Sequence, residues 1–317
     1  MLFAIILLVV FSLIAIKISP REKKQHALVH GAGQIGLLAA VALFGVDYFT
    51  SYFYATGELM NALHPYGLQQ YSYIAVAVIA LANAVFGGLY IFSLGIFNEG
   101  GGSYTASMRY LAPTLSLIVA VTLIQDYILT IVVSALSGVD QLLSILNAYG
   151  ITWIWHFGIG AILVSIMCWI TISGRGESAR IVFIMLGIFA GMTVTLAVGL
   201  FLANGRGVAA LPLPEVPQQV GLAQAMMHML TASVKGMVAL SVLEAMSNGI
   251  QFVIDEDVSL VKLGKQHLPR FGKLWQFYSG KSGIGRFVQT AFLFYGGLTT
   301  LFLSFFALRF NAFDGNV

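Results

Sequence analysis

Three carboxylic acids stand out because each lies inside a long apolar stretch of the sequence. They are Asp47, Asp126 and Glu244. An ionisable side chain in such surroundings is costly to bury, and it usually faces a protein interior or a water-filled path for ions or protons. The three acids are therefore the first candidates for chemistry in this chain.

The first acid shares a helix face with several oxygen-bearing side chains. Asp47 is followed by Thr50, Ser51 and Tyr54 at i+3, i+4 and i+7, and this spacing places all four on one side of a helix. Such a row of oxygen atoms predicts a lining for a cation. The structural alternative is that the hydroxyls bond backbone carbonyls and that Asp47 caps a broken helix.

The acid Glu244 has apolar residues on both sides and is followed by Ser247, Asn248 and Gly249, which favour a break in a helix. A carboxyl group that is removed from water can exchange a proton near neutral pH. We therefore predict a role in proton coupling. The structural alternative is an interhelical hydrogen bond from a permanently protonated acid.

The third acid opens the segment 126–130, which also contains a tyrosine and a threonine. Tyr127 and Thr130 are three residues apart and share a helix face, whereas Asp126 points about 100° away from Tyr127. We expect Tyr127 and Thr130 to line a path for the cation and Asp126 to brace a neighbouring helix.

Several other kinds of site are not indicated. The glycine-rich loop 99–104 lacks the Lys-Ser/Thr pair and the preceding strand of a nucleotide-binding loop, so a flexible or tightly turned loop at the membrane edge is expected. Cys168 is the single cysteine, which excludes an internal disulfide framework and a cysteine-based zinc site. We find no arrangement for nucleophilic catalysis and expect no enzyme activity, cofactor or resident metal.

The elements that must position these residues are membrane-spanning helices. Of 317 residues, 58% are hydrophobic and 9% are charged, against roughly 25% charged in an ordinary soluble domain. This composition excludes a soluble enzyme, a nucleic-acid-binding protein and a disordered chain. A spanning helix needs about 20 mostly apolar residues. We predict an all-α polytopic membrane protein whose eight spans cover 2–17, 33–56, 72–97, 111–137, 150–173, 179–203, 222–254 and 284–309.

The distribution of Lys and Arg predicts the orientation. If residues 18–32 are cytoplasmic, thirteen Lys and Arg residues fall on that side and only Arg206 and Arg309 on the other. We therefore expect a multi-pass protein of the inner (plasma) membrane with both ends outside the cytoplasm. The alternative to a retained first helix is an uncleaved signal sequence. The loop 255–283 is expected to be an amphipathic cytoplasmic connector whose basic residues face water and lipid headgroups.

Three isolated basic side chains within the spans have simpler explanations than a site. Lys235 lies within the span 222–254, and its long side chain is expected to reach the outer membrane interface. His156 and His228 are expected to be packing or interface residues, since two isolated histidines are weak support for a metal or a haem.

Three segments in matching order resemble landmarks of a known family. They are Glu99–Thr105, Asp126–Thr130 and Leu243–Gly249. Together they are similar to the amino acid–polyamine–organocation (APC) superfamily, and within it to the KimA-type potassium importers, which are related to the KUP potassium transporters. The resemblance runs from about residue 33 to residue 254.

The resemblance implies a LeuT-like fold, with five core helices and five more inverted in the membrane, and with broken first and sixth core helices near the midplane. It implies potassium binding by Asp47 and Tyr54 on core helix one, and by Tyr127 and Thr130 on core helix three. On core helix six it implies proton coupling by Glu244, with Ser241 at a position that is a threonine in the family. The mild change to serine keeps the hydroxyl.

The sequence departs from the family in two further respects. Lys235 lies nine residues before Glu244, where a neutral residue is expected, and its role is open. Only two helices of the second repeat are expected, so the chain looks like the amino-terminal part of a transporter. The expected division is 1–32 for an extra transmembrane helix and a basic cytoplasmic loop, 33–203 for the first repeat, and 204–317 for the start of an incomplete second inverted repeat.

The leading hypothesis is a secondary active transporter for proton-coupled potassium uptake. The alternatives are an amino-acid permease of the same superfamily, whose substrate would be a small amino acid, and an incomplete membrane subunit that does not transport. The expected partners are potassium or a small amino acid, protons and the lipid bilayer. A second copy in a homodimer, or a separate chain that supplies the missing helices, is a further expectation, whereas nucleic acid is not.

Overall fold

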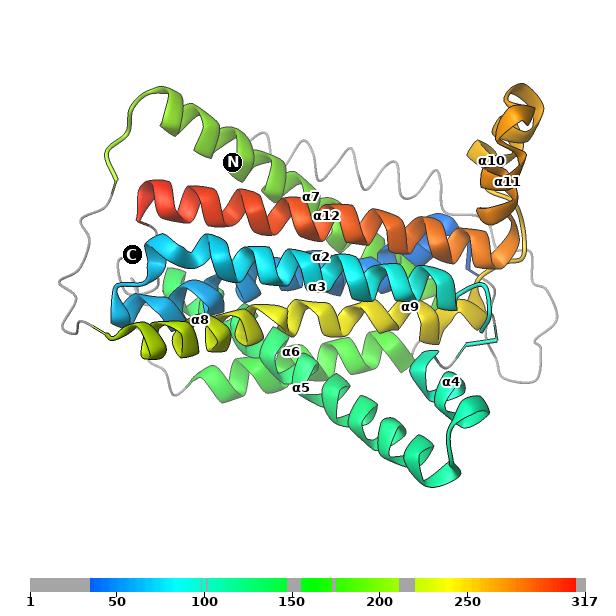
Figure 1. The fold of residues 1–317 in the computed structure, drawn as a ribbon, viewed down its shortest axis with the longest axis horizontal. Helices are drawn as coiled ribbons and strands as arrows, with labels where there is room; N and C mark the ends of the chain where they lie inside the picture. Colours follow the sequence, from blue (N-terminus) through cyan, green and yellow to red (C-terminus); the bar gives the residue numbers. More distant parts are fainter. Residues whose placement is uncertain are drawn as a thin grey trace.

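The structure is a computed structural model that describes residues 35–97, 99–100, 102–146, 155–172, 175–210 and 220–311. Within these residues the regular elements are helices, apart from an isolated parallel bridge between Ile35 and Val253. The long helices lie roughly along one direction and form a bundle, from which the beginning of α5 and the short helices α4, α10 and α11 diverge (Figure 1).

Seven of the eight predicted apolar stretches fall on helices, and the first stretch, 2–17, lies outside the described residues. The long helices are α2 (Leu37–Leu63), α3 (Ser72–Ser93), α5 (Pro113–Leu146), α6 (Trp155–Ile172), α7 (Arg175–Gly205), α8 (Leu222–Gly236) and α12 (Gly280–Phe310). The shorter elements are α4 (Gly102–Tyr110), α9 (Leu243–Gly249), α10 (Ser259–His267) and α11 (Gly272–Phe277), with 3-10 turns η1 (His64–Tyr66), η2 (Gln69–Tyr71), η4 (Met237–Val242), η5 (Ile250–Phe252) and η6 (Pro269–Phe271).

The described residues hold six helical stretches that are long and apolar enough to cross a membrane, and a shorter apolar helix covers Gly158–Trp169. Many large apolar side chains on these helices face outwards, as on Leu81, Phe92 and Trp169. Lipid tails can cover such surfaces, whereas water cannot do so without cost. The chain is therefore a multi-pass membrane protein, and the part that the structure describes is built of helices.

The predicted break in the span 33–56 is wrong, because α2 is one continuous helix through Asp47. Gly45 has a packing role instead of a breaking one: a Cβ atom there would lie 3.0 Å from the Phe292 ring. A glycine inside an apolar helix favours either a break or a close helix contact. At Gly45 the glycine allows close contact with the neighbouring helix α12.

The predicted break in the span 222–254 is present, and it begins before Glu244. The α-helix α8 ends at Gly236, the 3-10 turn η4 follows, and α9 resumes regular geometry at Leu243. The Ser-Asn-Gly sequence marks the end of α9, since Gly249 is its last residue. Glu244 consequently lies in the first turn after the irregular segment.

A buried polar network joins α2, α3 and α12 in the centre of the bundle. The Tyr52 hydroxyl donates to the Tyr48 hydroxyl at 2.9 Å, and Tyr48 donates to Asn83 Oδ1 at 3.1 Å. The Asn83 amide donates to the Leu293 carbonyl at 3.0 Å. The Tyr48 ring stacks on Phe292 with the centroids 4.8 Å apart. Satisfied networks of this kind fix how helices pack against one another.

Gly296 allows this packing, and its replacement gives a sharp test. A Cβ atom at Gly296 would lie 2.6 Å from the buried Tyr48 hydroxyl, whereas one at Gly297 would meet nothing within 4 Å. We expect Gly296→Ala to lower the free energy of unfolding by about 1–3 kcal/mol. Gly297→Ala, the matched control, should leave it unchanged or raise it by up to about 1 kcal/mol through helix propensity.

Thermal unfolding of both variants in one detergent measures this difference. Equal melting temperatures for the two variants would contradict the packing that places Gly296 against the Tyr48 and Tyr52 rings.

Candidate functional site

The α2 residues chosen from the sequence form a chain of hydrogen bonds along one helix face. Tyr54 Oη donates to Ser51 Oγ at 2.8 Å. Ser51 Oγ in turn lies 2.6 Å from the Asp47 backbone carbonyl and 3.4 Å from Asp47 Oδ1. Ser51 is fully buried, and Asp47 and Tyr54 are partly buried. The predicted common face of Asp47, Ser51 and Tyr54 is therefore present.

Thr50 behaves differently from its three neighbours. Its hydroxyl donates to the backbone carbonyls of Val46 at 2.9 Å and Asp47 at 3.1 Å. This is the local backbone bonding that polar side chains commonly make inside helices. The structural alternative considered for the hydroxyls of this segment thus applies to Thr50, and in part to Ser51.

Glu244 is buried, with 6% of its surface exposed, and accepts hydrogen bonds from two other helices. Its Oε1 accepts from the backbone N–H of Ser103 at 2.8 Å and from the Ser103 hydroxyl. Its Oε2 accepts from the Tyr90 hydroxyl at 3.2 Å. A buried carboxyl group that accepts several hydrogen bonds is held in a defined position.

The glycine-rich loop brings Ser103 to this carboxyl group. Gly100 and Gly102 have positive φ angles of +92° and +46°, which L side chains rarely adopt. A Cβ atom at Gly102 would lie 2.7 Å from Glu244 Oε1, and one at Gly100 would lie 3.1 Å from the Asn248 carbonyl. The tight turn therefore lets the first turn of α4 approach α9.

Gly102→Ala is expected to detach α4 from α9. The strain of a positive φ is shared with Gly207, whose φ is +66° but whose Cβ would meet nothing within 4 Å. Gly207→Ala is therefore the matched control. Because Glu244 must move away from Ser103 in the first variant alone, we expect it to lose about 1–3 kcal/mol more stability than the control.

Trypsin cleavage after Arg109, an exposed residue of α4, reports the same event. Cleavage should be faster in Gly102→Ala than in Gly207→Ala. Equal cleavage rates and equal melting temperatures would show that contact between the loop and Glu244 does not hold α4 in place.

Helix α5 meets the interrupted span through the two residues predicted to share a face. The Asn248 amide nitrogen donates to the Tyr127 hydroxyl. Thr130 Oγ1 lies 3.5 Å from Ser241 Oγ, at the outer limit of a hydrogen bond. Tyr127, Thr130 and Ser241 are thus brought together with the segment that carries Glu244.

Asp126 lies within electrostatic range of both Asp47 and Glu244. It therefore connects the polar row on α2 with the residues around Glu244. In the part of the chain that the structure describes, no Lys or Arg forms an ion pair with any of these three acids. Lys235 lies 3.8 Å from Glu58 instead, with both side chains about half exposed. A pair as exposed as this contributes little to stability, and it leaves the cluster of Asp47, Asp126 and Glu244 without a paired Lys or Arg among the described residues.

A buried carbonyl oxygen near this cluster has no donor among the described residues. Asn248 Oδ1 accepts no hydrogen bond from the described residues, although its amide nitrogen is used. The Ser134 hydroxyl lies beside Asp47 and Tyr54. A carbonyl oxygen without a donor is costly to bury, and a cation is one partner that would satisfy it.

An apolar cavity and the contact of His228 are separate from the cluster. A cavity of about 330 Å³ lies between α2, α7 and α12 and has an almost wholly apolar lining. No group of three His, Cys, Asp or Glu side chains in the described residues is placed to hold a metal ion. His228 stacks on Tyr66 with ring centroids 3.6 Å apart, which confirms its packing role, and the His156 side chain lies outside the described residues.

The sequence analysis did not identify Tyr90, Ser103 and Asn248 as contacts of the cluster. Only Ser103 carried a local signal, since a serine after glycines and before a helix is typical of a helix start. Tyr90 is one of many aromatic residues in α3, and its role depends on α3 packing beside α9.

No family model matches the chain, and no solved structure matches it. The chain is similar to a curated protein named potassium transporter KimA, from Bacillus subtilis (strain 168), with 30% identity over 228 residues. The match covers 69% of this chain and 36% of the relative, so the chain spans little more than a third of that protein's length. The relative's name describes a transporter, which fits the expectation that this chain is not an enzyme.

Proposed function

We propose that the chain serves proton-coupled potassium uptake, as a secondary active transporter or as the part of one that carries the ion-binding residues. The proposed potassium ligands are Asp47, Tyr54, Tyr127, Thr130 and Ser241, with Ser51 and Thr50 supporting them, and Glu244 is the proposed proton-coupling acid. The relative named potassium transporter KimA supports the substrate.

The observation that carries the proposal is a cluster of acids without a paired cation. Asp47, Asp126 and Glu244 lie in membrane-spanning helices, and Asp126 is within electrostatic range of each of the other two. No described Lys or Arg forms an ion pair with any of them. Uncompensated carboxyl groups at this depth are costly unless protons or a cation neutralise them. Potassium and protons together meet that need.

The amino-acid permease hypothesis gains no support from α2. Binding a substrate carboxylate in that way would use free backbone N–H groups at a break in the helix. Helix α2 is continuous at Asp47, and the Asp47 side chain would repel a carboxylate. We retain the permease only as an outcome of the test.

The fold proposal is a LeuT-like arrangement of an APC-superfamily protein. In this proposal residues 33–203 form the first repeat and 204–317 begin the inverted second repeat. The interruption at η4, just before Glu244, supports it, since such folds place binding residues at a discontinuous helix. The inner membrane as the location, a homodimer and a chain that supplies further helices are parts of the same proposal.

Uptake of rubidium by a potassium-requiring strain that expresses this chain tests the function. Growth at low potassium, and uptake that rises with an inward proton gradient, are the expected results. Uptake of an amino acid without rubidium would favour the permease. No uptake of either, by a chain that reaches the membrane, would favour a non-transporting subunit.

A further inference from the structure

The segment between the last two spans forms a small helical arm outside the membrane-spanning part. The span Leu222–Phe252 is followed by the span Gly280–Phe310, and α10, η6 and α11 lie between them. Figure 1 shows α10 and α11 at the end of the bundle where α12 begins, projecting to one side of the long helices. We refer to residues 258–278 as the α10–α11 arm.

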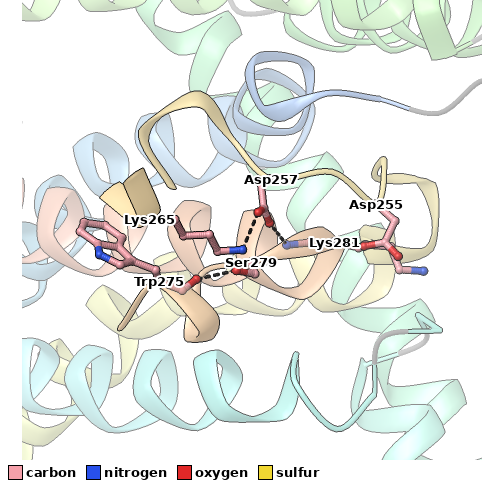
Figure 2. A network of polar contacts seen from close by, with 7 residues as sticks. Asp255, Asp257, Lys265, Trp275, Ser279 and Lys281 are labelled. Atoms are coloured by element: carbon pink, nitrogen blue, oxygen red, sulfur yellow. Dashed lines mark hydrogen bonds and ion pairs between the residues drawn. The ribbon is translucent and has the colours of Figure 1, made fainter. Parts of the chain in front are cut away.

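Two aspartates fix the base of the arm to the start of α12 (Figure 2). Asp255 Oδ1 accepts from the Lys281 backbone N–H at 2.8 Å, and Asp257 Oδ1 accepts from the Gly280 N–H at 2.9 Å. Asp257 Oδ2 accepts from Lys265 Nζ at 2.6 Å. The hydrogen bond from Lys265 and that from Gly280 lower the pKa of Asp257, so this connection stays ionised at neutral pH.

The two helices of the arm also pack on each other. The Trp275 indole N–H donates to the Leu268 carbonyl at 2.8 Å, and a Cβ atom at Gly264 would lie 2.6 Å from the indole ring. Val261 on α10 is also buried. The arm therefore has its own fixed shape, and its remaining apolar side chains are not used in this contact.

Those remaining side chains are large, apolar and exposed. Between 46% and 58% of the surface is exposed on each of Leu260, Leu263, Leu268, Phe271 and Leu274. On the spans such exposure is explained by lipid tails, but this arm lies outside the spans. Five such residues within fifteen positions form an apolar surface that water would cover only at a cost.

The same arm carries positive charge and no negative charge. Residues 258–278 contain Lys262, Lys265, Arg270 and Lys273 and no Asp or Glu. Lys265 is paired with Asp257, whereas the other three form no ion pair with a described residue. Exposed apolar groups beside unpaired basic groups are typical of segments that lie in the interface of an anionic membrane.

We propose that the α10–α11 arm binds the surface of an anionic phospholipid bilayer. Lys262, Arg270 and Lys273 contact lipid phosphates, and the exposed leucines with Phe271 enter the boundary between headgroups and acyl chains. The charge complementarity and the position of the arm where the spans end favour lipid over another protein. This proposal does not depend on the transported substrate.

A fluorescent probe on the arm tests the proposal. Leu263→Cys is labelled with an environment-sensitive dye in a Cys168→Ser background, because Cys168 is also exposed. The labelled chain is placed in nanodiscs of phosphatidylcholine with or without phosphatidylglycerol, each containing quencher-bearing lipid. We expect quenching that is several-fold stronger with phosphatidylglycerol, and loss of that difference in Lys262→Gln/Arg270→Gln/Lys273→Gln.

The control is Val208→Cys, at an exposed apolar residue just beyond Gly205, the last residue of α7. Its quenching should not depend on phosphatidylglycerol. A Leu263 probe that stays in water in both kinds of nanodisc would overturn the proposal, as would equal quenching in both. Probe burial that requires two chains in one nanodisc would overturn it in favour of a contact between copies.

Discussion

Asp47→Asn is expected to raise the potassium concentration needed for half-maximal uptake by roughly 30- to 150-fold. The amide keeps the shape of the side chain and can still accept from Ser51 Oγ, which lies 3.4 Å from Asp47 Oδ1. It removes the charge whose attraction offsets the dehydration of the ion. A lost charged contact of this kind costs on the order of 2–3 kcal/mol, which gives that range.

Glu58→Gln is the matched control for this variant. Glu58 lies on the same helix, is about half exposed, and contacts Lys235 at 3.8 Å. Its neutralisation should change rubidium uptake less than about threefold, in keeping with the small contribution of an exposed pair. If Asp47→Asn also has the parent's uptake curve, the polar face of α2 is structural and the potassium proposal fails.

Glu244→Gln is expected to abolish the dependence of uptake on the pH gradient while leaving ion binding largely intact. The glutamine resembles the protonated acid and cannot exchange its proton. Its carbonyl oxygen can still accept from the Ser103 N–H, and its amide can donate to the Tyr90 hydroxyl, so α4 should stay in place.

Rubidium uptake at several external pH values measures this effect, with equilibrium ion binding measured beside it. Glu256→Gln is the control, because Glu256 is an exposed acid outside the spans. A Glu244→Gln protein whose uptake still follows external pH would show that this acid does not couple protons. Loss of ion binding in the same variant would instead assign Glu244 to the ion site.

Within single helices, the candidate site could be predicted from residue spacing. The hydrogen-bonded row of Asp47, Ser51 and Tyr54 needs only a regular helix, since residues at i, i+4 and i+7 meet on one face. The common direction of Tyr127 and Thr130 follows from the same geometry. Thr50 shows the limit of this approach, because spacing does not say whether a hydroxyl faces a ligand or its own backbone.

Contacts between distant segments could not be predicted in this way. Ser103 and Glu244 are 141 residues apart, and Asn248 and Tyr127 are 121 residues apart. Their meeting depends on how α4, α5 and α9 pack, and packing is set by the shapes of many side chains together. The glycines at 100 and 102 signalled a turn, but not the carboxyl group against which the turn packs.

The sequence by itself determined that this is a multi-pass membrane protein with acids inside its spans, because hydropathy and charge act locally on each segment. Only the tertiary structure decided which of the closely packed glycines lies where a helix is interrupted. Gly45 lies against Phe292 and leaves α2 continuous, whereas Gly236 lies against Ile79 at the point where α8 gives way to a 3-10 turn. The physical reason is that a missing Cβ atom permits close packing with or without a change of helix geometry, and the surrounding side chains select between the two.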